Sequence, residues 1–457
     1  MSSHSLSKDF TKGNIPRALL WFTLPFMASN ALQVLYSTVD MVIVGQYVGV
    51  PGLSAVSQGS LIVNFVTMVC LGYSNAGQVL VSQTIGAGKQ KELNHIIGTL
   101  FTMILSMGFI LSLIVVAVHP MIFNWMNIPE ESYLMARDYV IICGLGLVLT
   151  AGYNMVSAVL RGMGDSKRPF MFIAIASIIN LVLDIVFTGF WGWGVAGAAY
   201  ATVIGQAASF VFSLVYLYRK KSEFGFDFQK KSFVPQKKYV SMILSLGTPM
   251  AIQSGCINLS MLFVNSMVND IDVVASASFG VGVRIDDIFN KISQGIQYAA
   301  MPMISQNIGA GRLNRAKYVV WYSWLFSTVF TVFIFVVYLC FGKELFVWFS
   351  DDPLVHDMAP TFISAILWMF PALAIMRGTG AFVQGIGNVR LGMILSILDG
   401  VLLRIGLSWF FGLYLEWGFY GFVLGYGLAA YGCAIPGMIY FLSGIWKKRR
   451  SLAEDIG

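Results

Sequence analysis

Long apolar stretches alternate with short polar connections along the whole chain. The hydrocarbon core of a bilayer, about 30 Å thick, needs about 20 apolar residues in each helix that crosses it. Twelve stretches meet this need, and they lie near residues 15–44, 52–84, 94–118, 132–160, 168–189, 194–218, 238–268, 275–308, 315–341, 357–386, 391–412 and 418–445. The pattern predicts an all-α polytopic membrane protein with twelve transmembrane helices.

The composition supports this class, because 57% of the 457 residues are hydrophobic and only 11% are charged. Soluble domains carry about 25% charged residues. The net charge of +7 comes from basic residues that gather in alternate connections, above all in residues 219–238, while acidic residues occupy the connections between them. This positive-inside pattern predicts that both termini are cytoplasmic. We therefore expect a lipid bilayer, and not a nucleic acid, as the partner of the basic residues.

The sequence lacks the usual signatures of enzymes and metal centres. Its five cysteines stand singly in apolar stretches, which fits neither a disulfide framework nor metal-ligand spacing. The four histidines are far apart, and no HExxH or GxSxG motif occurs. We expect no enzyme activity, no metal centre and no cofactor.

Two short motifs recur at one fixed offset. SQTIGAG at 82–88 returns as SQNIGAG at 305–311, and RGMG at 161–164 returns as QGIG at 384–387, both 223 residues later. The glycines of GAGK lack the spacing of a phosphate-binding loop, so we interpret them as a tight turn. The duplication predicts two parallel six-helix lobes around a central cavity, with an N-terminal lobe at 1–225, a cytoplasmic linker at 226–237 and a C-terminal lobe at 238–457.

Asp40 is an acidic residue inside the first apolar stretch. Gln33, Tyr36 and Ser37 precede it by seven, four and three residues, so all four share one face of a helix. Ionised carboxylates are costly at membrane depth unless they are neutralised or used in function. Gln33, Tyr36 and Ser37 are candidates for lining a substrate cavity, although Ser37 alone, like Thr202 alone, is better explained by a hydrogen bond between helices.

Asp184 is a second intramembrane carboxylate, and Asn180 lies one helical turn before it. No lysine or arginine lies in the middle of an N-terminal span to neutralise either acid. Protonation and a bound cation remain as explanations, so Asp40 and Asp184 are predicted to form an ion-coupling site. Sodium would find oxygen ligands at Asp40, Asn180, Asp184 and Thr202. Further amide and hydroxyl groups of this half are Tyr139, Asn154 and Thr202.

The C-terminal half carries charges of both signs at membrane depth. They are Arg284, Asp286, Asp287, Lys291, Arg377, Asp399 and Arg404. Asp287 and Lys291 form an i,i+4 pair of favourable orientation. The set is interpreted either as an internal network of ion pairs or as a substrate-binding or gating group.

With these features in place, the chain resembles the multidrug and toxic compound extrusion (MATE) family over nearly its whole length. The resemblance rests on the twelve spans, the duplicated SQxIGAG motif and LRGMGDSKRP after the fourth span. It looks most similar to the DinF-type branch, which has a bend-forming proline fifteen residues before an aspartate, matched by Pro25 and Asp40. An Asn–Asp pair in the fifth helix matches Asn180 and Asp184, and Tyr139, Asn154 and Thr202 resemble the accompanying polar groups.

The resemblance implies cation-coupled export of amphipathic, often cationic compounds by alternating access, from a monomer in a bacterial inner membrane. The sequence leaves the coupling ion open between H⁺ and Na⁺, and the branch likeness favours protons. The alternative is a flippase of the same superfamily for lipids or lipid-linked oligosaccharides. Arg284, Lys291, Arg377 and Arg404 would suit its anionic substrates, whereas the acidic N-terminal half argues against it.

Overall fold

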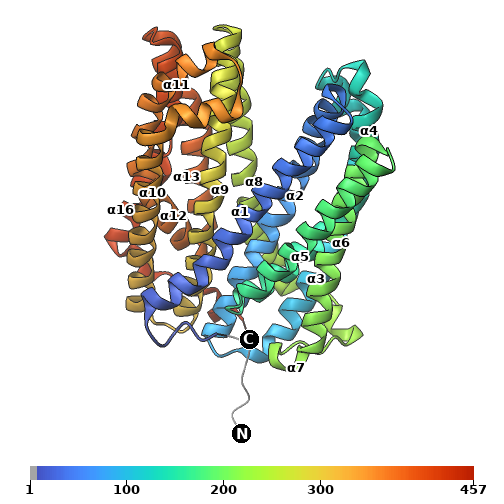
Figure 1. Ribbon diagram of the computed structural model, residues 1–457. Coiled ribbons are helices and arrows are strands. Elements are labelled where there is room, and N and C mark those ends of the chain that lie inside the picture. Colours follow the sequence, from blue (N-terminus) through green and yellow to red (C-terminus); the bar gives the residue numbers. More distant parts are fainter. Residues whose placement is uncertain (1–7, 457) are drawn as a thin grey trace. The chain divides into compact units, whose positions relative to one another are not determined.

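The computed structural model describes residues 8–456, which are almost wholly helical and include no strand (Figure 1). The helices of the first half are α1 (Ile15–Tyr47), α2 (Val50–Gly86), α3 (Leu93–Trp125), α4 (Glu130–Gly162), α5 (Lys167–Asp184), α6 (Gly194–Arg219) and the short α7 (Lys221–Phe224). Those of the second half are α8 (Lys237–Asn269), α9 (Val273–Gly309), α10 (Leu313–Phe349), α11 (Pro353–Ile366), α12 (Phe370–Gly385), α13 (Val389–Ser396), α14 (Arg404–Trp409), α15 (Gly418–Leu428) and α16 (Tyr431–Ser443).

Among the described residues, eleven helical stretches are long and apolar enough to cross a membrane. Some predicted spans contain a local change of helix type: α11 joins α12 through a 3₁₀ turn, and α13 joins α14 through a π-helix at Ile397–Leu403. The remaining predicted span, the eighth (275–308), is α9, which is 37 residues long but carries the charges of Arg284, Asp286, Asp287 and Lys291 near its middle. The prediction of an all-α protein with twelve membrane-length helical stretches is confirmed.

Contacts within the chain define two compact units. Unit 1 contains residues 8–9, 28–251 and 455–456, and unit 2 contains residues 10–27 and 252–454. Helices α1 and α8 therefore contribute to both units, and each changes unit two residues after an internal proline, Pro25 or Pro249. Proline removes a backbone donor and weakens a helix at that point. The lobes at 1–225 and 238–457 and the bend at Pro25 stay predictions.

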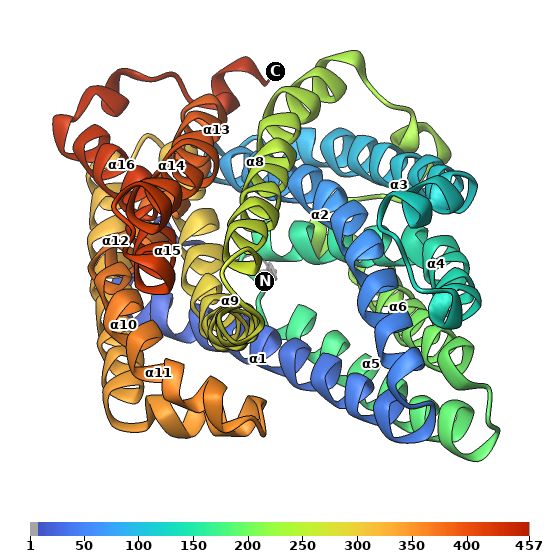
Figure 2. The same cartoon turned by 90° about the horizontal axis from the view of Figure 1, so that it is seen from above.

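Helix α4 of unit 1 packs against α2, α3 and α6, and Figure 2 shows it beside α3 and α6. Small residues allow close approach, as where Gly108 of α3 meets Ala151 of α4. Helix α5 packs on α6, and a side chain at Gly205 of α6 would meet the Cβ atom of Asn180 at 3.1 Å. Glycine at this position therefore lets α6 approach the part of α5 that carries Asn180 and Asp184.

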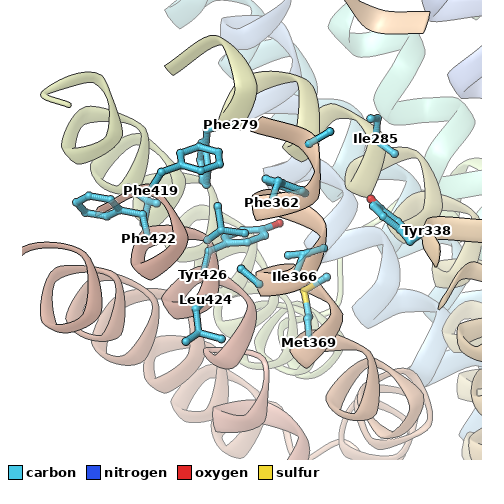
Figure 3. Close-up of a cluster of buried hydrophobic side chains, with 14 of the residues drawn as sticks. Phe279, Ile285, Tyr338, Phe362, Ile366, Met369, Phe419, Phe422, Leu424 and Tyr426 are labelled. Carbon is cyan, nitrogen blue, oxygen red and sulfur yellow. The ribbon is translucent and has the colours of Figure 1, made fainter. Parts of the chain in front are cut away.

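Unit 2 has an aromatic core between α9, α11 and α15. Phe279, Phe362, Phe422 and Tyr426 are all buried there (Figure 3). The Phe279 and Tyr426 rings meet edge to face with centroids 6.0 Å apart. This core fixes Tyr426, whose hydroxyl group then reaches a buried carboxylate on α9.

Each copy of the duplicated motifs ends a helix in the same way. Gly88 and Gly311 follow α2 and α9 with φ of 71° and 68°, a conformation that favours glycine. The next N–H, of Lys89 or Arg312, donates to the carbonyl five residues earlier, of Thr84 or Asn307. This is a Schellman-type helix end. The interpretation of GAGK as a tight turn is confirmed, and the duplicated sequence corresponds to a duplicated turn.

Candidate functional site

The site in unit 1 is built around the two predicted intramembrane acids. Asp40 lies on α1, and Asp184 is the last residue of α5, directly before a π-helix at Ile185–Phe190. The exposed fractions of the two residues are 9% and 1%. Their carboxyl groups lie close enough to interact directly with each other. The structure thus brings together two acids that are 144 residues apart in the chain (184 − 40 = 144).

Polar side chains from α1, α4 and α5 surround this acid pair. Asn180 interacts with Asp184 from one turn earlier on α5. The hydroxyl groups of Tyr36 and Tyr139 lie within electrostatic range of Asp40. Tyr139 is buried, and its ring occupies the space that a side chain at Gly59 of α2 would take, with only 2.6 Å between the two. Packing between α2 and α4 therefore fixes the tyrosine beside the pair.

The acid pair has fewer hydrogen-bond partners than its buried oxygens need. Within residues 8–456, Oδ1 of Asp40, Oδ1 of Asp184 and Nδ2 of Asn180 are buried and make no hydrogen bond. No group of three or more His, Cys, Asp and Glu side chains suited to a metal ion occurs in this part of the chain. Buried polar atoms are normally satisfied. The acid pair is therefore incompletely satisfied within unit 1.

The other predicted residues of this half lie at varied depths. Gln33 and Ser37 are exposed on α1, whereas Asn154 and Thr202 are half-buried on α4 and α6. No hydrogen bond links Asn154 or Thr202 to the acid pair in the described structure. Gln206, which sequence reasoning missed, has a buried Oε1 atom without a partner among residues 8–456. It lies one turn after Thr202 on α6, and this i,i+4 spacing was the signal that could have identified it.

Unit 2 contains a buried polar network around Asp286 of α9. Oδ2 of Asp286 accepts hydrogen bonds from the Tyr426 hydroxyl at 2.9 Å and from Nδ2 of Asn290 at 2.7 Å. Arg377 of α12 donates to the Asn290 carbonyl at 3.2 Å and to Oγ of Ser293 at 2.9 Å. Asp286 and Arg377 are 2% and 6% exposed. Asp286 is therefore held by donors on α9 and α15, and Arg377 of α12 in turn holds Asn290, one of the two donors.

A second pair extends the same network. Arg404 of α14 donates to Oδ1 of Asp399 at 3.1 Å, and its guanidinium lies over the Tyr426 ring, 5.0 Å from the centroid. Asp399 lies in the π-helix at Ile397–Leu403. The remaining predicted residues of this half, Arg284, Asp287 and Lys291, are exposed on α9. The structure thus joins Asp399 and Arg404 to Asp286 and Arg377 through Tyr426 and Asn290.

Comparison with known proteins identifies relatives of the whole chain. The family model MatE matches residues 25–186 and again residues 249–410. The two matches are offset by 224 residues (249 − 25 = 224), in agreement with the duplication, and each begins at one of the two helix prolines, Pro25 and Pro249.

Individual relatives agree with the family match. The probable multidrug resistance protein YpnP of Bacillus subtilis is 28% identical, over 98% of this chain and 99% of its own length. The probable multidrug resistance protein NorM of Thermotoga maritima is 25% identical, over 99% of this chain and 98% of its own length. A solved structure, described as the outward-facing conformation of a multidrug resistance MATE family transporter, has a TM-score of 0.90 at 20% identity, covering 98% of this chain and 100% of that one. At that identity the structural likeness establishes the fold.

Proposed function

The chain belongs to the MatE family of multidrug transporters, and from this premise we propose that it is a proton-coupled antiporter that exports amphipathic, often cationic compounds by alternating access. The observation that carries the proposal is the contact between Asp40 and Asp184 in unit 1. The substrate class follows from the same feature, because an acidic site attracts cations when it is ionised.

The acid pair supports proton exchange on electrostatic grounds. Two ionised carboxylates in contact repel each other, so such a pair binds a proton or a cation. Two carboxyl groups this close can share one proton, and the likeness to the DinF-type branch also favours H⁺ over Na⁺. Loss of the proton leaves a negative charge beside the rings of Tyr36 and Tyr139, a suitable environment for a flat cation. The proton and the drug would then alternate at one site.

The driving force is sufficient for concentrative export. One proton that crosses a membrane with a proton-motive force of about 100–200 mV supplies about 2.3–4.6 kcal/mol. This free energy sustains a concentration ratio of roughly 50-fold to 2,000-fold for an exchanged compound. The positive-inside pattern supports a bacterial inner membrane with both termini in the cytoplasm.

The test is efflux of a fluorescent cationic dye from proteoliposomes under an imposed pH gradient without Na⁺. We expect wild type to export the dye only with the gradient, and Asp40→Asn at matched reconstitution to export none. Asp138→Asn is the control, because Asp138 also lies in the first half but is exposed and paired with Arg137 at 3.0 Å. Undiminished export by Asp40→Asn would refute the mechanism. Export by wild type that requires added Na⁺ would assign the coupling to sodium.

A further inference from the structure

The central connection, which is the polar stretch at residues 219–238 between α6 and α8, packs on α3 within unit 1. Phe226, Phe228 and Phe233 surround the Phe101 ring of α3, and their ring centroids lie 5.8, 6.2 and 5.7 Å from it. Aromatic contacts of this kind bury a large apolar area and prefer a definite geometry. The acid pair of unit 1 does not explain why a polar connection should be fixed in this way.

Polar contacts with α3 complete the docking of the central connection. Oγ1 of Thr102 donates to the Phe233 carbonyl at 2.6 Å, and Nδ2 of Asn94 donates to Oγ of Ser232 at 2.9 Å. A Cβ atom at Gly98 would overlap the Ser232 carbonyl, so glycine there lets the connection lie against the helix. The 3₁₀ turn that contains Ser232 and Phe233 is therefore held in one position on α3.

The two acidic residues of the central connection are bound by donors of unit 1. Asp227 accepts from the Ser232 hydroxyl at 2.7 Å and from Asn94 at 3.0 Å. Glu223 forms an ion pair with Lys220 at 2.7 Å. The connection contains seven basic and two acidic residues, so a net charge of +5 remains (7 − 2 = 5). Positive charge therefore dominates this surface.

The other six basic residues of the central connection are exposed. They are Arg219, Lys221, Lys230, Lys231, Lys237 and Lys238. Within residues 8–456, none of the six takes part in a salt bridge. Lys221 and Lys238 lie over the rings of Tyr218 and Tyr239, which carry no charge to neutralise them. The docked connection thus presents a set of cations that lacks anionic partners.

The ends of the central connection coincide with the ends of two membrane-length helices. Arg219 is the last residue of α6, and Lys237 is the first of α8. Basic residues at such helix ends reach the level of the lipid headgroups. Between the lysines lies Val234, which is 62% exposed. An exposed apolar side chain among lysines suits a lipid surface, which offers acyl chains beside its phosphate groups.

We propose that the central connection is a binding site for the headgroups of anionic phospholipids, in the leaflet that faces the cytoplasm in the predicted topology. The docking on α3 holds the Lys230 and Lys231 side chains in place, and the phosphate groups of the lipids supply the missing anions. The lipid is recognised by charge, so a zwitterionic headgroup binds less well. This proposal goes beyond the proposed function and does not depend on which compound the chain transports.

The test is titration of the detergent-solubilised full chain with phosphatidylglycerol, read by native mass spectrometry, with phosphatidylcholine as the zwitterionic reference. Wild type should bind phosphatidylglycerol more tightly than phosphatidylcholine. The double variant Lys230→Gln with Lys231→Gln should lose affinity for phosphatidylglycerol roughly fivefold or more, with its affinity for phosphatidylcholine unchanged. Equal affinities of wild type for the two lipids would overturn the proposal.

The matched control is the double variant Lys447→Gln with Lys448→Gln. These two lysines are also adjacent and exposed, and they also lie in a 3₁₀ turn, at Ile445–Lys448. Both double variants lower the net charge by the same amount, so an effect of overall charge would be equal in the two. An equal loss of affinity for phosphatidylglycerol would therefore overturn the assignment of the site to the central connection.

Two measurements on wild type complete the test. Glycerol phosphate, a soluble phosphate without acyl chains, should not displace phosphatidylglycerol at equal concentration, and full displacement would assign the site to free phosphate compounds instead of lipids. In nanodiscs, the backbone amides of residues 229–234 should exchange with deuterium severalfold more slowly in phosphatidylglycerol than in phosphatidylcholine, whereas those of residues 445–450 should exchange equally in both. Equal exchange of residues 229–234 in the two lipids would also overturn the proposal.

Discussion

Unit 1 and unit 2 bury acidic side chains in opposite ways. In unit 1, Asp40 and Asp184 contact each other, and each keeps an oxygen that makes no hydrogen bond within residues 8–456. In unit 2, Asp286 accepts two hydrogen bonds, and Asp399 is paired with Arg404. A satisfied buried network rigidifies a structure, whereas an unsatisfied acid gains when it binds a proton or a cation. The comparison teaches that two halves of one duplicated sequence bury charge in different arrangements, incompletely paired in unit 1 and paired in unit 2.

The largest expected effect is the loss of transport with retention of the fold. Asp184→Asn keeps the shape of the side chain but removes the exchangeable charge, so proton-driven efflux should fall at least tenfold, to background. The free energy of unfolding should stay the same or rise, because the acid it removes is incompletely paired. Both are measured on one sample, by dye efflux and by thermal unfolding in detergent. If Asp184→Asn loses transport and also unfolds at a lower temperature than wild type, the contrast between the acids of unit 1 and unit 2 is contradicted.

Breaking the ion pair of unit 2 should destabilise the fold, in contrast to the Asp184→Asn substitution in unit 1. Arg404→Met leaves Asp399 buried without its partner, and we expect a loss of about 3–5 kcal/mol in the free energy of unfolding. The double variant Asp399→Leu with Arg404→Met removes both charges and should recover to within about 1 kcal/mol of wild type. Chemical denaturation of the single and double variants measures this. If the double variant does not recover, the attraction between the two charges exceeds the cost of burying them, and the pair adds net stability.

The sequence predicts much of this contrast but not its geometry. Asp40 and Asp184 are identifiable because carboxylates are rare in apolar spans without a basic partner. Their contact is not predictable from spacing, because it depends on how α1 and α5 are rotated toward each other and on the π-helix that follows Asp184. The duplicated motifs predict the repeat and its turns, since glycine at positive φ is a local requirement.

In unit 2 the spacing favours a different acid from the one that the structure buries. Asp287 and Lys291 have ideal i,i+4 spacing, yet both are exposed. Asp286, one residue earlier, is buried and accepts from Asn290, which lies at the same i,i+4 distance. One residue turns a helix by about 100°, so adjacent acids point to different surroundings. Which of the two faces the core depends on Tyr426 of α15, and this long-range partner cannot be read from α9 alone.

A smaller effect should follow when one donor of the network is removed. Tyr426→Phe keeps the ring in the aromatic core and its contact with Arg404 but removes the hydroxyl that donates to Asp286. We expect a loss of about 2 kcal/mol in the free energy of unfolding. Tyr338→Phe is the matched control from the same core, because the Tyr338 hydroxyl is buried and makes no hydrogen bond within residues 8–456, so its removal should be neutral or stabilising. Equal losses in the two variants would contradict the role of the network.

The smallest expected effect concerns an acid at the surface, where solvent replaces the protein as the main partner. In the connection between α7 and α8, the Ser232 hydroxyl donates to Asp227 at 2.7 Å, and further donors are the Gln229 N–H at 2.9 Å and Asn94 at 3.0 Å. These hydrogen bonds hold the pKa of Asp227 below its ordinary value of 3.8.

Because this pKa is lower in the folded protein than in the unfolded chain, the ionised carboxylate stabilises the fold above the unfolded pKa, near pH 4, and this contribution is lost as the pH falls through the folded pKa. Asp227→Asn should therefore unfold at a slightly lower temperature than wild type at neutral pH, and the difference should vanish in acid. Thermal unfolding of both proteins across the pH range measures it, with full exposure of Asp227 keeping the effect small. If the difference in unfolding temperature stays constant with pH, the effect comes from the geometry of the connection between α7 and α8. The charge of Asp227 would then contribute nothing to the comparison with the buried acids.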